Sequence, residues 1–169
     1  MNGSFFGSTR IGACLHAEHQ TTLAALNDLE LLARFRSPPD VADATTQARL
    51  ADIARVLEED VSRHFGFEEA ELFPLLRTAG AGFMVDMLLA EHEDIRPIAE
   101  ELSVVARAGA TDGFDAAAWG RFRKLAEDII DRETFHVQKE EMGLLAALSQ
   151  VLDADQDAAL AERHAALTA

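Results

Sequence analysis

The sequence predicts an all-α protein, an up-down-up-down four-helix bundle that allows a short fifth helix at its C-terminal end. Leu and Ala supply 52 of the 169 residues, whereas Val and Ile supply only 14, and this balance favours helices over strands. Four long segments repeat apolar residues at helical spacing, and Pro or Gly residues separate them. Helices joined by such short loops are typical of an antiparallel bundle, and a chain of this length suits one domain.

The first two helices are separated by the Pro-Pro pair at 38–39. The apolar pattern predicts the first helix over about 11–35, because the prolines cannot continue it. The second helix is predicted over about 41–77. Gly66 and Pro74 lie inside this segment, so we expect a kink near the glycine and a break near the proline.

The second half of the chain carries two more long helical patterns and a short one. The third helix is predicted over about 83–107, with Pro97 as a potential kink and the glycine-containing stretch 108–113 as its exit. The fourth helix is predicted over about 115–151. The amphipathic segment 154–167 is the candidate for the fifth helix.

These patterns divide the chain into three parts. Residues 1–10 are interpreted as an N-terminal arm, residues 11–151 as the bundle and residues 152–169 as a helical tail. The arm contains the adjacent pair Phe5 and Phe6, and neighbouring phenylalanines rarely stay free in water. The arm is either packed on the bundle or a disordered end, and the two phenylalanines favour packing.

The chain is strongly acidic, with 15 basic and 30 acidic residues and a formal net charge of −15. Such a field opposes binding to nucleic acids and to anionic membranes. Cys14 is the only cysteine, which rules out an intrachain disulfide. No apolar run approaches the roughly 20 residues of a membrane span, and the N-terminus lacks a basic region followed by an apolar one. We therefore expect a cytoplasmic protein without a nucleic-acid or membrane partner.

Each of the four long helices points one histidine toward the predicted core. A helix advances about 100° per residue, so side chains can be compared by angle. On the first helix, Leu15, Leu23 and Leu26 fall within about 40° of His19. The same comparison places histidines among apolar residues on the next three helices, at His64, His92 and His136. A single core histidine is usually a hydrogen-bonded structural residue, so the set carries more weight than any member.

Two of these histidines are followed by a glutamate at i+4, in the pairs His64-x-x-x-Glu68 and His136-x-x-x-Glu140. This spacing places both side chains on one side of a helix, about 6 Å apart. One such pair alone usually forms a surface ion pair. Four imidazoles and two carboxylates inside one small core are costly without compensation, and a metal centre supplies that compensation. The sequence therefore predicts a metal site.

The ligand types narrow the choice of metal. Imidazole and carboxylate suit iron, manganese or zinc, and the lack of a cysteine cluster excludes iron–sulfur and structural zinc sites. Six candidate ligands exceed the need of one tetrahedral zinc ion, which indicates two metals. Ferritin-like di-iron sites use Glu-x-x-His on two helices, and here only Glu133-x-x-His136 fits. A zincin motif that starts at His92 ends in Arg96 instead of a second histidine.

Four runs of sequence together resemble a known family, and they extend over roughly residues 11–150. They are AEHQTTLAALNDLELL (17–32), HFGFEEAELFPLL (64–76), AEHEDIRPIAEEL (90–102) and HVQKEEMGLLAAL (136–148). Together they are similar to the hemerythrin-like HHE cation-binding domain. The resemblance implies two non-heme iron ions, bridged by two carboxylates and an oxo or hydroxo group. It implies iron ligands at His19, His64, Glu68, His92, His136 and Glu140.

The sequence departs from oxygen-carrying hemerythrins in two places. Those proteins have a second histidine one turn after the third-helix histidine, where this chain has Arg96. They also have an aspartate five residues after the last histidine, where this chain has Glu141, with Glu140 at the i+4 spacing. The pattern resembles instead bacterial four-histidine HHE proteins, including the di-iron domain of iron–sulfur cluster repair proteins. We expect this protein to lack the cysteine-containing N-terminal domain that those proteins often carry.

These departures lead to a hypothesis about the reactivity of the site. A site with four histidines leaves an open position on each iron, so we expect it to be more labile and more reactive than the di-iron site of an oxygen carrier. Alternatively, Arg96 pairs with a nearby acid such as Glu133 or Glu93 and has a structural role.

The resemblance implies a di-iron protein that binds or reacts with O2, NO or peroxide. An alternative is an iron-handling protein that donates iron or takes part in iron–sulfur cluster repair. A second alternative is a structural helical bundle that binds metal only incidentally. Enzymatic redox activity toward O2 or peroxide stays open. The expected partners are a small diatomic ligand or peroxide, and the expected assembly is a monomer or homodimer.

Other side chains receive simpler interpretations. His16 is a supporting partner of the site or an alternative first ligand, and Glu69 and Glu71 hold imidazole N–H groups or solvate the surface. His164 in the tail is expected to be exposed. Four phenylalanines are expected to pack the bundle: Phe65, Phe67, Phe73 and Phe135.

Overall fold

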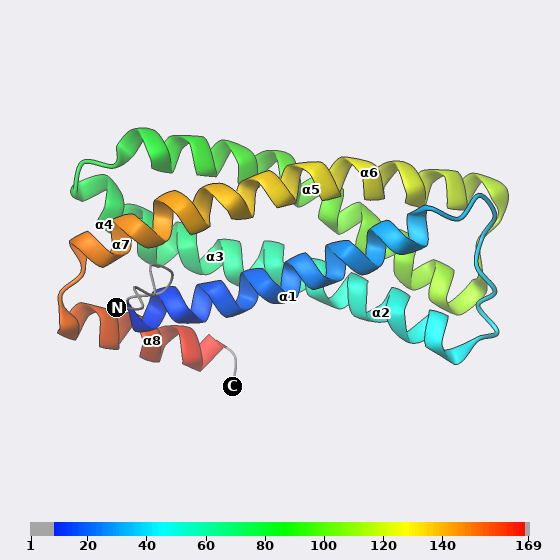
Figure 1. Ribbon diagram of the computed structural model, residues 1–169, viewed down its shortest axis with the longest axis horizontal. Helices are drawn as coiled ribbons and strands as arrows, with labels where there is room; N and C mark the ends of the chain where they lie inside the picture. The colour runs from blue at the N-terminus through cyan, green and yellow to red at the C-terminus, as the bar shows by residue number, and fades with distance from the viewer. Residues whose placement is uncertain (1–8, 168–169) are drawn as a thin grey trace, which may run out of the picture.

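The computed structural model describes residues 9–167, and every regular element in this range is helical (Figure 1). The first and third long helices of the bundle are the single elements α1 (Arg10–Ala33) and α5 (Gly82–Asp112). The second long helix is a continuous series of α2 (Ala44–Glu59), η1 (Asp60–His64), α3 (Phe65–Phe67), η2 (Glu68–Leu72) and α4 (Phe73–Thr78). The fourth is a series of α6 (Ala116–Lys139), η3 (Glu140–Leu144) and α7 (Leu145–Val151). The shorter α8 (Ala154–Leu167) follows. The predicted all-α bundle with a short fifth helix is confirmed.

The helices pack in chain order and close into a bundle. The α2 helix packs on α5, α5 packs on α6, and α1 contacts both α2 and α6. Figure 1 shows α8 lying outside this bundle, against the first half of α1, and the two helices are in contact. Packed helices therefore surround the polar centre described below, and α8 covers one of them, α1, from the outside.

Side chains and glycines fix where the helices begin and end. Thr9 and Asp43 accept hydrogen bonds from backbone N–H groups in the first turns of α1 and α2, as helix N-caps. Gly113 ends α5 with φ 77°, a conformation that side chains disfavour. Gly109 leaves room for Phe114, because a Cβ atom there would lie 1.9 Å from the ring.

Several helix boundaries differ from the prediction. The α5 helix runs through Pro97 and continues to Asp112, so most of the predicted exit 108–113 is helical. Near Gly66 the helix carries a π-helical turn on each side, η1 and η2. Pro74 does not break the chain's helical path, since it lies in the first turn of α4, where a missing N–H is tolerated.

The interior consists of two apolar clusters. The larger one joins residues such as Leu29, Leu57, Leu102 and Phe122 near the α1–α2 and α5–α6 loops. The second joins residues such as Leu15, Leu72, Leu88 and Leu148 at the opposite end, and it includes Leu160 of α8. On each long helix, a histidine lies in the sequence between residues of the two clusters. The polar centre thus separates two dry halves of the core.

Part of the predicted N-terminal arm can be compared with the structure. The first helix begins at Arg10, inside the segment assigned to the arm. Phe5 and Phe6 lie outside the described residues. Among residues 9–167, none of the helices combines the length and the apolar character that crossing a bilayer requires.

Candidate metal centre

Six polar side chains meet in the middle of the bundle, and each is at most 3% exposed. They are His19 on α1, His64 at the end of η1, Glu68 at the start of η2, His92 on α5, His136 on α6 and Glu140 at the start of η3. These are the six residues that the sequence analysis singled out, and the fold brings all of them together.

Both central carboxylates begin a π-helical turn. Glu68 opens η2 and Glu140 opens η3, and π turns inside α-helices often mark functional sites. Each turn begins at the i+4 partner of a histidine, so the pairs His64–Glu68 and His136–Glu140 keep both side chains directed at the centre. The local backbone thus supplies two pairs of candidate ligands from two helices.

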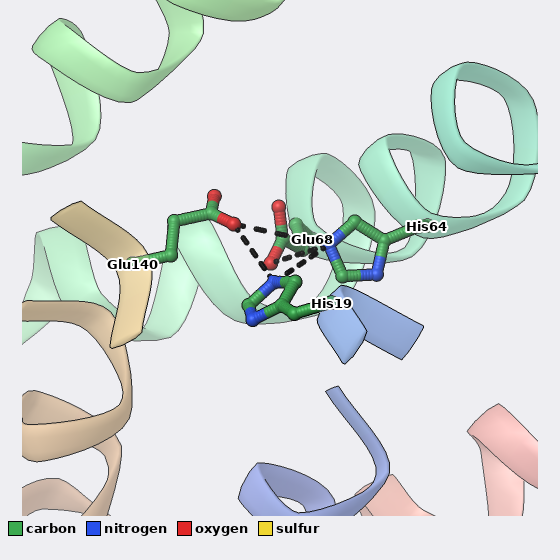
Figure 2. A group of neighbouring side chains, drawn as sticks. All are labelled: His19, His64, Glu68 and Glu140. Carbon is green, nitrogen blue, oxygen red and sulfur yellow. Dashed lines mark hydrogen bonds and ion pairs between the residues drawn. The ribbon is translucent and has the colours of Figure 1, made fainter. Parts of the chain in front are cut away.

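The six side chains form two overlapping groups, each with two histidines and both glutamates. One group contains His19 and His64, and Figure 2 shows their rings directed at Glu68 and Glu140. The other group contains His92 and His136 with the same two glutamates. Within each group, the four candidate donor atoms lie within 4.8 Å of one another.

Each central carboxylate turns one oxygen toward each histidine pair. Glu140 Oε2 lies 3.1 Å from His19 Nε2, and its Oε1 lies 3.1 Å from His136 Nε2. Glu68 Oε1 lies 3.4 Å from His64 Nε2, and its Oε2 lies 3.5 Å from His92 Nε2. This arrangement is that of two carboxylates that could bridge two cations.

Each imidazole is oriented by a different glutamate on its outer side, which we call the four outer glutamates. The Nδ1 contacts are His19 to Glu141 at 2.6 Å, His64 to Glu18 at 2.8 Å, His92 to Glu69 at 2.8 Å and His136 to Glu91 at 2.9 Å. An ionised carboxylate can only accept, so each Nδ1 donates its proton outward. Each Nε2 of a neutral ring then presents its lone pair to the centre.

The inner atoms of this centre require positive charge between them. Nε2 of His19 lies 3.2 Å from Nε2 of His64, and the same distance separates His92 from His136. None of the four oxygens of Glu68 and Glu140 has a hydrogen-bond partner among the described residues. Facing lone pairs and buried carboxylates are costly unless a cation lies among them.

The pKa values of the buried groups reflect the same requirement for positive charge. Burial alone would lower the pKa of His136, but the Glu140 carboxylate raises it to about 11. Burial also opposes charge on His92, and the nearby carboxylates of Glu140 and Glu68 raise its pKa to about 9. Burial and the neighbouring Glu140 charge raise the pKa of Glu68. Before a metal binds, protons therefore occupy part of the space that the donor atoms surround.

The donor set fits two transition-metal ions. Each group offers two imidazole nitrogens and two carboxylate oxygens, a mixture that suits iron, manganese or zinc. Four protein atoms leave open positions on an octahedral ion. Phe65 stacks on the His92 ring at 3.7 Å between centroids, and Phe73 lies 5.5 Å from the same ring. These rings keep water from one side of the centre.

Each outer glutamate also has a basic partner. Glu69 accepts from Arg96 at 2.8 Å, and Glu91 pairs with Lys139. Glu141 contacts His16 at 2.9 Å, and Glu18 contacts His164 at 3.1 Å. Hydrogen bonds from His164 and His64 outweigh the effect of burial and hold the pKa of Glu18 well below its usual range. The outer glutamates are thus fixed on both sides.

The inner and outer residues come from two repeated sequence patterns. Ala-Glu-His occurs at 17–19 on α1 and at 90–92 on α5, and in both the glutamate holds a histidine of another helix. His-x-x-x-Glu-Glu occurs at 64–69 and at 136–141. In both of these, the first glutamate faces the centre and the second holds a histidine of α5 or α1. The centre is therefore an approximate twofold arrangement.

These repeats locate the residues that the sequence interpretation missed. Glu69 holds an imidazole N–H as predicted, whereas Glu71 pairs with Arg163 on the surface. The equivalent roles of Glu18, Glu91 and Glu141 were not predicted. Comparison of the two Ala-Glu-His and the two Glu-Glu sequences could have indicated them.

Two expectations about individual side chains are wrong. His164 is buried rather than exposed, because α8 packs it against Glu18 and Phe67. Phe135 is 62% exposed and does not pack the bundle. Arg96 pairs with a nearby acid, as the alternative interpretation predicted, but the acid is Glu69 rather than Glu133 or Glu93, and Arg96 also donates to the carbonyl of Val61 in η1. His16 contacts Glu141, the partner of His19, which is the supporting position predicted for it.

Glu133 belongs to a separate buried acid pair. It is 1% exposed, and its carboxyl group lies against that of Asp60, which accepts a hydrogen bond from Thr22. Burial and the Asp60 charge raise the pKa of Glu133 well above its usual value. This pair therefore holds a proton inside the bundle.

Comparison with known proteins agrees with this geometry. The family model of the hemerythrin HHE cation binding domain matches residues 12–148. This range contains all six central residues and the four outer glutamates, whereas α8 lies beyond it. No significant match is found among curated proteins.

Proposed function

Because the chain belongs to the hemerythrin HHE cation-binding family, we propose that it is a non-heme di-iron protein that binds or reacts with O2, NO or peroxide. The observation that carries the proposal is the division of each central carboxylate between two histidine pairs. We propose His19 and His64 as ligands of one iron and His92 and His136 as ligands of the other. Glu68 and Glu140 then bridge the two.

The bound irons would supply reversible electron transfer and open coordination positions for small molecules. The protein residues would hold this chemistry in place. The four outer glutamates keep the Nδ1 proton on each ring, so every Nε2 stays available as a ligand. Phe65 and Phe73 limit water at the His92 side, which slows proton access and iron loss.

A small cavity lies beside one of the six central side chains. Its volume is about 60 Å³, and Glu18, Thr22, Asp60, Arg63 and His64 are among its lining residues. A space of this size can hold water or a diatomic gas. This is compatible with the small partners expected from the sequence, O2, NO or peroxide, at the His64 side of the centre. Assembly as a monomer or homodimer and a cytoplasmic location stay predictions.

The test is anaerobic loading with Fe(II), followed by optical spectroscopy as O2 is admitted and then removed. Two irons per chain and a change in the visible spectrum on exposure to O2 are the expected result. A reversible change supports O2 binding or sensing, and an irreversible one supports a redox or iron-handling role. Fewer than two irons, or no response to O2, NO or peroxide, would contradict the proposal. The matched control is Glu140→Gln, which keeps the shape of a bridging residue and removes its charge.

A further inference from the structure

The two repeats of the centre differ in charge at one equivalent position. In the repeat at 136–141, Lys139 pairs with the outer glutamate Glu91, which holds His136. The same position of the repeat at 64–69 is Phe67, which is 3% exposed and has no charge. Glu18, the outer glutamate that holds His64, therefore gains no lysine partner from the repeat itself.

The α8 helix supplies the missing partner. His164 Nε2 lies 3.1 Å from Glu18 Oε1, while Glu18 Oε2 lies 2.8 Å from His64 Nδ1. The His164 ring sits edge-on against Phe67, with 5.1 Å between ring centroids. Arg63 also approaches Glu18, at the longer distance of 3.4 Å. The His164 ring of α8 thus contacts Phe67, the residue that occupies the lysine position in this repeat.

Other contacts fix α8 in this position. Asp157 accepts hydrogen bonds from the backbone N–H groups of Arg10 and Ile11, at 2.7 and 2.9 Å, and so caps the start of α1. Leu160 is 1% exposed and belongs to the second apolar cluster, which also contains Leu15 and Leu148. Arg163 pairs with Glu71 at 3.0 Å. The helix is therefore held at several points along its length, and His164 has a defined place.

We propose that His164 is a positioning residue for one of the two metal ions. Through Glu18 it fixes the ring of His64, and it thereby tightens the ion held by His19 and His64 while leaving the ion held by His92 and His136 unaffected. The α8 helix, which lies beyond the family domain at 12–148, is on this basis a functional part of the metal centre. The inference rests on the proposed two-metal site.

The experiment measures iron release into excess chelator from the full chain, with iron content measured before mixing. His164→Phe keeps a ring against Phe67 and removes the N–H donor. We expect about half of the iron to leave at least about tenfold faster than in wild type, and the rest to leave at the wild-type rate. His164→Gln, which keeps a donor, should restore slow release. Glu162→Ala, at an exposed position of α8 outside the contacts that hold the helix, should behave as wild type.

A mirror variant tests the assignment to one ion. Lys139→Met removes the partner of Glu91 and should accelerate the other half of the iron, so the double variant with His164→Phe should release both ions fast. Unchanged release from His164→Phe, or equal acceleration of both ions, would overturn the inference. If His164→Phe lowers the Tm of the metal-free and the metal-loaded protein by the same amount, α8 has a purely structural role, and this result would also overturn the inference. If wild type itself binds no iron, the proposed function fails instead.

Discussion

The Nε2 atoms of His92 and His136 lie 3.2 Å apart, although both rings direct their Nδ1 atoms at outer glutamates. Two inward lone pairs at this distance need a cation between or beside them. Protons can take that role in the metal-free protein, because against the effect of burial the Glu140 carboxylate, joined by Glu68 at His92, raises the pKa values to about 9 for His92 and about 11 for His136. Metal and proton therefore compete for the same space.

The stabilisation that metal gives should grow with pH. Both histidines have an ordinary pKa of 6.5 and raised values in the folded protein, so their contribution to metal-free stability is complete below pH 6.5 and is lost as pH rises through about 9 and then about 11. The metal-loaded protein does not depend on these protons. The difference in Tm between loaded and chelator-treated protein should be larger at about pH 9 than at about pH 7. A constant or smaller difference would contradict this.

Glu68→Gln should separate metal binding from folding. Burial and the Glu140 charge raise the pKa of Glu68, so a neutral amide of the same shape should change the metal-free stability by no more than about 1 kcal/mol. Because each oxygen of Glu68 faces a different histidine pair, both ions should bind at least about tenfold more weakly. Metal titration and chemical unfolding of the chelated protein measure the two effects. Full retention of both irons would exclude Glu68 as a bridge.

Arg96→His tests whether four histidines make the site labile. Arg96 lies one helical turn after His92 and donates to Glu69 and Val61, so an imidazole there would start close to the His92 pair. We expect slower oxidation by O2 and slower iron loss, since an open position would be closed. Arg96→Lys keeps a cation near Glu69 without an imidazole, and it should not show this slowing. Unchanged oxidation and iron retention in Arg96→His would remove the hypothesis.

Glu133→Gln should stabilise the metal-free protein at alkaline pH. The pKa of Glu133 is raised by burial and then by Asp60, so folding becomes less favourable as pH rises above the usual value of 4.5. An amide keeps the shape, cannot ionise and can donate to Asp60. We expect a gain of about 1–3 kcal/mol at about pH 8 that shrinks toward about pH 5. Denaturant unfolding at both pH values measures it, and a gain independent of pH would point to another cause.

The sequence predicts the bundle well because helical periodicity and loop residues act locally. The pattern of His19, His64, His92 and His136 on apolar faces is also a local property, and the fold brings these side chains together in the candidate metal centre. Local sequence patterns do not predict which α8 residues are buried. His164 and Glu18 are 146 residues apart in sequence, and only the packing of α8 on α1 brings them together.

Some of the missed features are backbone conformations that the residue types do not indicate. The residues of η2 and η3 have the pattern of ordinary α-helix, because a π turn leaves no composition signal of its own. The stretch 108–113 was interpreted as the exit of the third helix, yet α5 continues to Asp112, and Pro97, the potential kink, lies inside it. Packing on α2 and α6 outweighs the local preferences there.

The π turn at η3 has a consequence for how the chain tolerates insertions and deletions. A π turn accommodates one extra residue within an α-helix. Removal of one residue between Glu140 and Leu144 would therefore let the helix return to α geometry with little change in the phase of the residues that follow. Leu145 and Leu148 would keep their places in the apolar cluster that they share with Leu160, while the change in direction would fall on the residues of the turn, which begins at Glu140. A length change there could alter the candidate metal centre and leave the end of the bundle and the packing of α8 in place.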